Sequence, residues 1–279
     1  MTNNNPIGVL DSGLGGLTIW KEITALLPHE STIYIGDSKN APYGARHTDE
    51  IYRLSQKMIA FLLSKGVKLI VLACNTITVS CLDKLRENYP DMPIVGTVPV
   101  IKTAAAVTRN KQIGVLSTTY TAKSQYQKKL IAQFANGCIV HTHGTDALVP
   151  LIEKGEISGE KIEYILKTTF AKFKKEKVDT IALGCTHFPF LRTQMREILG
   201  PQVALLDSGA AIARQVKRVL ENNNTLTEQK HPRHEFYTTG DPRIAKKLLA
   251  GTIAEEKEFQ KIFLGDVEDP RKRAEISST

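Results

Sequence analysis

The chain has 279 residues, of which 42% are hydrophobic and 24% charged, and no apolar run reaches the roughly 18 residues typical of a membrane-spanning helix. Its formal net charge of +8 suits a basic surface or a small anionic substrate. Nucleic-acid binding is disfavoured, because the lysines are spread over several expected helices rather than gathered in one arm.

Cysteine usage and the start of the chain both favour a cytoplasmic protein. The four cysteines, Cys74, Cys81, Cys138 and Cys185, include no pair with CxxC spacing, and a chain of this size needs no disulfides to fold. Residues 1–5 are polar and lead at once into a strand-like run, which is not typical of a secretory signal. We therefore expect the cysteines to stay reduced.

The first expected strand, residues 7–10, leads into a glycine-rich turn at residues 11–18 and then into a helix over residues 17–27. Glycines at such a turn let the backbone bend tightly and leave N–H groups free at the start of the helix. The spacing of these glycines matches neither the dinucleotide-binding pattern nor a Walker loop. Alone, the turn indicates only a strand, a turn and a helix.

Further strands and helices alternate after this turn. Apolar residues at helical spacing predict a helix over residues 48–64, and a helix with Val79, Leu82 and Leu85 ends before Pro90. The long loop at residues 36–44 contains proline and glycine, as loops that carry binding residues often do. The strands expected in this part are residues 32–35, 69–72 and 94–96.

The pattern then restarts, and the two halves of the chain align. Residues 7–12 match residues 113–118 at a shift of 106, and the same shift pairs Ile33-Tyr34 with Ile139-Val140. From residue 51 onward the shift becomes 111, which pairs Cys74 with Cys185 and residues 94–97 with residues 205–208. Agreement across four strands with one change of shift indicates an internal duplication.

The sequence therefore predicts an α/β protein with two similar, doubly wound domains. Each would have a mostly parallel sheet of four to five strands, related by pseudo-symmetry, with the active site in the cleft between the domains. After the second repeat we expect a helix at residues 209–220, a polar linker at residues 221–232 and a strand at residues 236–239. A second helix would begin at residue 242, and an edge strand would follow at residues 259–264. This segment would return to the first domain, giving domains of residues 1–97 plus 208–279 and residues 98–207.

The matched cysteines end two apolar runs, of the kind expected for strands buried on both faces of a parallel sheet. Ligands of open α/β sheets bind beyond the carboxyl ends of the strands, so Cys74 and Cys185 would present two thiols to one cleft. One thiolate could remove a proton from one face of a carbon while the opposite thiol delivers another. That chemistry inverts a stereocentre without a redox change.

Neighbouring polar residues could support this chemistry. Asn75, Thr76 and Thr186, with the backbone amides around them, could hold a carboxylate and stabilise the negative charge that develops. Asp11 and His187 are titratable and adjacent to the same loops, so they could set the protonation state of the thiols.

Other conspicuous residues have simpler interpretations. Cys81 and Cys138 are expected to be small buried hydrophobes. His141 and His143 share one face of a strand, but no third ligand has suitable spacing, so we expect no zinc site. Taken alone, Tyr43 and Glu153 would pack and meet solvent, respectively.

Five motifs taken together resemble the glutamate racemases of the cofactor-independent aspartate/glutamate racemase superfamily. The resemblance covers most of the chain, and its order and spacing make it specific. The motifs are Gly8-Val9-Leu10-Asp11-Ser12-Gly13-Leu14-Gly15-Gly16, Ala41-Pro42-Tyr43-Gly44, Ala73-Cys74-Asn75-Thr76, Gly184-Cys185-Thr186-His187-Phe188-Pro189 and Phe236-Tyr237-Thr238-Thr239-Gly240.

The resemblance implies interconversion of L- and D-glutamate for peptidoglycan synthesis, without pyridoxal phosphate, nucleotide or metal. Cys74 and Cys185 would be the acid–base residues, acting on the D- and L-enantiomer respectively, with Asp11, Glu153 and His187 as auxiliaries. Substrate would be bound by Asp11, Ser12, Tyr43, Gly44, Asn75, Thr76, Thr186 and His187.

Two alternatives remain open on the sequence. The protein could be a sister racemase acting on aspartate or another acid, or a non-catalytic binding or regulatory protein with a duplicated frame. The only partner expected is the small-molecule substrate, with no nucleic acid and no membrane. The sequence leaves the oligomeric state open, and a homodimer is one of the states that it allows.

Overall fold

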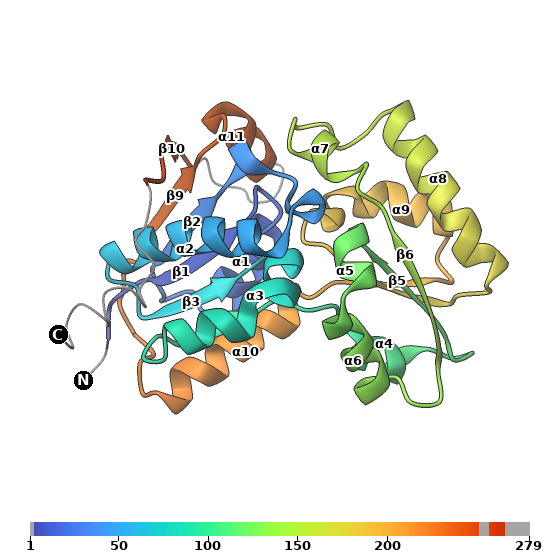
Figure 1. The fold of residues 1–279 in the computed structure, drawn as a ribbon, viewed down its shortest axis with the longest axis horizontal. Helices are drawn as coiled ribbons and strands as arrows, with labels where there is room; N and C mark the ends of the chain where they lie inside the picture. Colours follow the sequence, from blue (N-terminus) through green and yellow to red (C-terminus); the bar gives the residue numbers. More distant parts are fainter. Residues whose placement is uncertain (1–2, 251–256, 266–279) are drawn as a thin grey trace.

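The computed structural model describes residues 3–250 and 257–265, and over this part strands and helices alternate along the chain (Figure 1). The expected first domain extends to residue 279, so residues 251–256 and 266–279 of it lie outside the described part. The strands are β1 (Ile7–Asp11), β2 (Thr32–Gly36), β3 (Leu69–Leu72), β4 (Ile94–Gly96), β5 (Gln112–Ser117), β6 (Ile139–Gly144), β7 (Thr180–Gly184), β8 (Ala204–Leu206), β9 (His234–Thr238) and β10 (Phe259–Lys261).

The helices connect successive strands. The α-helices are α1 (Leu17–Leu26), α2 (Thr48–Ser64), α3 (Asn75–Asn88), α4 (Ile101–Val107), α5 (Thr119–Lys123), α6 (Gln125–Phe134), α7 (Val149–Ile152), α8 (Glu160–Lys175), α9 (Arg192–Leu199), α10 (Gly209–Asn222) and α11 (Pro242–Ala250). Three short 3₁₀ helices are η1 (Ser38–Asn40), η2 (Tyr43–Ala45) and η3 (Phe188–Leu191). In the described part of the chain, no helix combines the length and apolar character needed to cross a membrane.

The strands form two parallel sheets, as the sequence predicts for an α/β fold of this kind. The first has the order β10-β9-β2-β1-β3-β4 and the second the order β6-β5-β7-β8. The first sheet is one strand larger than expected, because β9 and β10 both add beyond β2. The segment after the second repeat thus joins the first sheet (Figure 1).

The two sheets share one strand order, since β2-β1-β3-β4 in the first corresponds to β6-β5-β7-β8 in the second. The register of the paired strands then tests the alignment of the two halves of the sequence. Gly8 pairs with Ile70 and Gly114 pairs with Ile181, in agreement with the shift of 111 at the cysteine strands. The alignment of the second strands is wrong by two residues. Gly8 pairs with Ile33 whereas Gly114 pairs with His141, so Ile33 corresponds to His141 and not to Ile139.

Both faces of each sheet are covered, because alternate residues of the strands enter different apolar clusters. Val9 packs in the cluster that contains α1 and α10, while Leu10 packs with α2 and α3. In the second sheet, Val115 packs with α4 and α6, and Leu116 joins the cluster that contains α8. This is the doubly wound arrangement, with helices on both sides of a parallel sheet.

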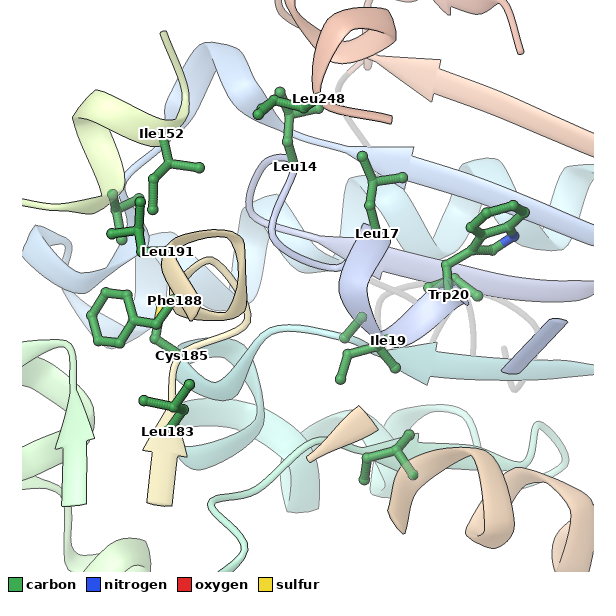
Figure 2. Packing of buried hydrophobic residues seen from close by; sticks show 14 of the residues in the cluster. Leu14, Leu17, Ile19, Trp20, Ile152, Leu183, Cys185, Phe188, Leu191 and Leu248 are labelled. Atoms are coloured by element: carbon green, nitrogen blue, oxygen red, sulfur yellow. The ribbon is translucent and has the colours of Figure 1, made fainter. Parts of the chain in front are cut away.

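One apolar cluster continues from the first sheet to the second. Leu14, which follows β1, belongs to the same cluster as Ile152 of α7 and Phe188 of η3. Figure 2 shows Leu14 with Leu248 of α11 at the top, and Phe188 close to Cys185 at the end of β7. The apolar core therefore reaches the region where the carboxyl ends of the two sets of strands meet.

Candidate active site

Cys74 and Cys185 occupy equivalent places in the two sheets and open onto one cavity. Cys74 stands immediately before α3, two residues after β3, and Cys185 comes directly after β7. Both are buried, with exposed fractions of 5% and 7%. The cavity is lined by Ser12, Pro42, Tyr43, Gly44, Cys74, Asn75, Thr76, Thr118, Val149, Cys185, Thr186 and His187.

This cavity is too small for an amino acid. Its volume is about 10 Å³, which is room for roughly one water molecule. An amino acid is several times larger, so the residues around the cavity must move apart for a substrate to enter. The structure therefore represents a closed form of the site.

Asp11 ends β1 and connects the two repeats. Its Oδ1 accepts a hydrogen bond from the amide of Gly13 at 2.8 Å, and its Oδ2 accepts one from the hydroxyl of Thr186 at 3.1 Å. Complete burial raises the pKa of Asp11 to about 6, although the charge of His187 and these two hydrogen bonds oppose the rise. The carboxyl group can therefore change charge close to neutral pH.

Cys74 is a neutral thiol in this closed form. Burial and the nearby charge of Asp11 raise its pKa to about 12, against the opposing effects of Ser12 and of the Ile77 amide at the start of α3. The Ser12 hydroxyl lies 3.3 Å from the sulfur. The helix N-terminus alone does not make this thiol acidic, because desolvation outweighs it.

His187 connects Cys185 to Glu153. Its Nδ1 lies 3.9 Å from the sulfur of Cys185, and its Nε2 lies 2.5 Å from Oε1 of Glu153. Burial lowers the pKa of His187, but the interactions with Cys185 and Glu153 outweigh burial and raise it well above 6.5. A protonated imidazole can donate to both neighbours, which places a proton source beside Cys185.

The glycine-rich turn after β1 is explained by its contact with this histidine and glutamate. A Cβ at Gly13 would lie 2.1 Å from Oε1 of Glu153, and one at Gly15 would lie 2.3 Å from Nδ1 of His187. The amide of Leu14 donates to Oε1 of Glu153 at 2.6 Å. The absence of side chains at these two positions lets the second repeat come within hydrogen-bonding distance of the turn.

The structure brings together the residues that the sequence singled out. All the expected substrate-binding residues except Asp11 line the cavity, and Asp11 and Glu153 lie one hydrogen bond behind it. Glu153 was expected in a loop, and it follows the last residue of the short helix α7. The catalytic and binding roles of these residues remain predictions.

Three lining residues were not named as site residues from the sequence: Pro42, Thr118 and Val149. Thr118 lies with its hydroxyl 3.2 Å from that of Thr76, which again joins the two repeats. A signal existed for Thr118, because the repeat pairs it with Ser12. Pro42 belongs to one of the motifs, and Val149 has no comparable signal.

The remaining cysteines and histidines lie away from the cavity. Cys81 is buried in α3, and Cys138 packs at the edge of a core cluster of the second sheet. All four cysteines are free thiols. His143 contacts Glu176 at 2.9 Å, and His141 contacts Gln112 at 2.8 Å; within residues 3–250 and 257–265, no group of three potential ligands could hold a metal ion.

Comparison with known proteins identifies the family. The model of the family described as Asp/Glu/Hydantoin racemase matches residues 7–216, which is most of the chain. The chain belongs to the Asp/Glu/Hydantoin racemase family. It is thus a cofactor-independent amino-acid racemase, an isomerase.

Individual members of the racemase family are similar over nearly their whole length. A glutamate racemase from Herpetosiphon aurantiacus is 44% identical over 246 residues, covering 88% of this chain and 96% of the relative. A glutamate racemase isoform from Bacillus anthracis has a solved structure with a TM-score of 0.86 and 31% identity, covering 94% and 98% of the two chains. A glutamate racemase from Francisella tularensis, solved in complex with D-glutamate, has a TM-score of 0.82 and 30% identity, covering 95% and 99%.

Proposed function

We propose that this racemase interconverts L- and D-glutamate by proton transfer at Cα between two cysteines. The observation that carries the proposal is that Cys74 and Cys185, from equivalent ends of duplicated strands, line one cavity. Glutamate as substrate is supported by the names of the similar proteins and by the D-glutamate in the Francisella tularensis structure.

The steps follow from the placement of the two thiols. With D-glutamate bound, the thiolate of Cys74 takes the Cα proton, the electron pair of the broken C–H bond moves toward the carboxylate, and the thiol of Cys185 returns a proton to the opposite face. L-glutamate reacts in the reverse direction, starting from Cys185. No electron leaves the substrate, and the two cysteines exchange protonation states in each turnover.

The surrounding residues stabilise the charge that develops on the substrate. Asn75, Thr76 and Thr186 line the cavity. The side chains of Asn75 and Thr76 carry hydrogen-bond donors suited to a carboxylate, and Thr186 would contribute its backbone amide, because its hydroxyl donates to Asp11. The proton on His187, held by Glu153, favours a thiolate on Cys185 when that residue acts as base. Asp11 lies one hydrogen bond behind Thr186, and when ionised its charge would compensate the ammonium group of the substrate.

We propose further that the D-glutamate serves peptidoglycan synthesis and hence cell-wall formation. The family that the sequence resembles supplies D-glutamate as a building block of the cell wall, which supports this assignment. It is tested by depletion of the protein in its host, which should be relieved by external D-glutamate.

The activity is tested by incubating the enzyme with L- or D-glutamate in D₂O. We expect deuterium at Cα as each enantiomer racemises, and about 10²- to 10⁴-fold slower turnover for Cys74→Ser and for Cys185→Ser. Cys138→Ser is the matched control, since Cys138 lies outside the cavity. Wild-type-like racemisation by either cavity variant would contradict the two-cysteine mechanism, and faster turnover of aspartate than of glutamate would contradict the substrate.

A further inference from the structure

Asp37 is a buried carboxylate that the proposed chemistry does not use. It follows β2 directly and has an exposed fraction of 0%. Three side chains donate hydrogen bonds to it: Tyr43 at 2.6 Å, Thr239 at 2.7 Å and Asn40 at 3.0 Å to each oxygen. A buried carboxylate with this many donors fixes the positions of the groups around it.

One of these donors belongs to the wall of the catalytic cavity. Tyr43 and the following Gly44 both line the cavity, and the Tyr43 side chain is buried. Burial and the charge of Asp37 raise the pKa of Tyr43 well above 10, so its hydroxyl keeps its proton and donates it to Asp37. The hydroxyl is thus committed to Asp37, and this bond acts together with apolar packing to hold the ring.

A second donor comes from the far end of the chain. Thr239 follows β9, whose residue Thr238 pairs with Gly36 of β2, so the carboxyl ends of the two strands meet. The Thr239 hydroxyl accepts a hydrogen bond from the amide of Lys39 at 3.1 Å and donates one to Asp37. The segment after the second repeat therefore reaches the cavity wall through a continuous chain of hydrogen bonds.

We infer that Asp37 and Thr239 are positioning residues that hold Tyr43 and Gly44 against the substrate and so set the affinity for it. The inference rests on the proposed glutamate racemase function and extends it to a residue contributed by the C-terminal segment. Neither Asp37 nor Thr239 lines the cavity, so both act through Tyr43. This gives β9 a role in the site as well as in the sheet.

The inference is tested with Thr239→Val, which keeps the shape of the side chain and removes the hydroxyl. We expect the KM for glutamate and the calorimetric Kd for D-glutamate to rise about tenfold, with kcat changed less than about threefold, because substrate binding rather than proton transfer is affected. Thr239→Ser should restore both constants. Thr238→Val is the matched control. Among the hydrogen bonds described, the Thr238 hydroxyl accepts one from the amide of Gly240 and makes none with Asp37.

A double-substitution cycle then shows whether Thr239 acts through Tyr43. Tyr43→Phe should raise KM by a similar factor, and Tyr43→Phe combined with Thr239→Val should be no worse than about the larger single effect. If Thr239→Val does not fold, as thermal melting will reveal, the same cycle is measured with Asp37→Asn and Tyr43→Phe.

Each result has a definite meaning. Unchanged KM and Kd for Thr239→Val, an equal loss in Thr238→Val, or single effects that multiply in the double variant would overturn the positioning role. Failure of the unaltered enzyme to racemise glutamate would overturn the proposed function, and this inference with it. Glutamate turnover with no response to Thr239→Val would overturn the inference alone.

Discussion

Glu153 and His187 form a hydrogen bond of 2.5 Å between Oε1 and Nε2, and the same carboxylate oxygen accepts the amide of Leu14 at 2.6 Å. One carboxylate therefore holds the imidazole next to Cys185 and also connects the second repeat to the turn after β1. A substrate can enter only if the cavity opens. This oxygen therefore takes part both in the contact between the two repeats and in holding the proton on His187.

Replacement of the carboxylate tests this connection. In Glu153→Gln the charge beside the imidazole is lost, so the pKa of His187 should fall. Turnover of L-glutamate should fall about tenfold, because His187 then holds less tightly the proton that favours the Cys185 thiolate. NMR titration of the imidazole and initial rates from each enantiomer measure the two effects.

Glu156→Gln is the control for this substitution, since Glu156 is an exposed neighbour three residues along the chain. It should leave both the titration and the rates unchanged. An unaltered His187 titration in Glu153→Gln would show that the carboxylate does not maintain the proton on the ring.

Asp11 should reduce stability as the pH rises. Its pKa in the folded protein, about 6, lies above the ordinary value of 3.8, so the folded state is favoured below pH 4 and loses that advantage as the pH rises through 6. A shift of about two units corresponds to about 3 kcal/mol of unfolding free energy. Asp11→Asn cannot ionise, so its stability relative to the wild type should increase by up to about 3 kcal/mol between pH 4 and pH 8, measured by denaturant unfolding.

Asp179 provides a control of opposite sign. Burial raises its pKa, but hydrogen bonds from Thr108 and the amides of Arg109 and Asn110 outweigh burial and lower it. A lowered pKa stabilises the fold above the ordinary value, so Asp179→Asn should lose stability relative to the wild type as the pH rises. A pH-independent difference between Asp11→Asn and the wild type would mean that the Asp11 carboxyl is not perturbed in the folded protein.

The Cys74 thiol should stay protonated in the ligand-free enzyme over the accessible pH range. Its pKa of about 12 predicts that the thiolate absorbance at 240 nm, taken as wild type minus Cys74→Ser, stays flat up to pH 10. The physical cause is burial beside Asp11, so substrate binding or opening must activate the thiol. A midpoint near the ordinary thiol value of about 8.5 would contradict this account.

Much of the fold and both cavity cysteines could be predicted because duplication fixes relative positions in the sequence. The shift of 111 is correct at β3/β7 and β4/β8, which places Cys74 and Cys185 at equivalent strand ends. The shift of 106, correct for β1/β5, fails for β2/β6 because those strands have different environments. β2 is buried between two strands, whereas β6 is a half-buried edge strand, so their apolar patterns do not correspond.

The contacts behind the cavity could not be predicted, because they join residues far apart in sequence through side-chain geometry. Thr239 contacts Asp37 across 202 positions, and Glu153 contacts Leu14 across 139. Strand pairing places such residues near one another, but burial and rotamer decide which hydrogen bonds form. The raised pKa values of Asp11 and Cys74 come mainly from burial by residues of both repeats, which no local pattern encodes.

A buried ion pair should anchor the connection that brings the C-terminal segment back to the first sheet. Lys68 lies 2.7 Å from Glu30 with both side chains 1% exposed, and its Nζ also donates to the carbonyl of Thr225 at 2.7 Å. Lys68→Met leaves the Glu30 charge buried without its partner, so we expect a loss of about 3–5 kcal/mol in unfolding free energy.

Lys65→Met is the control, because it removes an exposed lysine that also contacts a glutamate, and it should cost less than about 1 kcal/mol. The double variant Lys68→Met with Glu30→Met removes both charges and should be more stable than Lys68→Met alone. Equal losses in Lys68→Met and Lys65→Met on denaturant unfolding would show that the buried pair does not stabilise this connection.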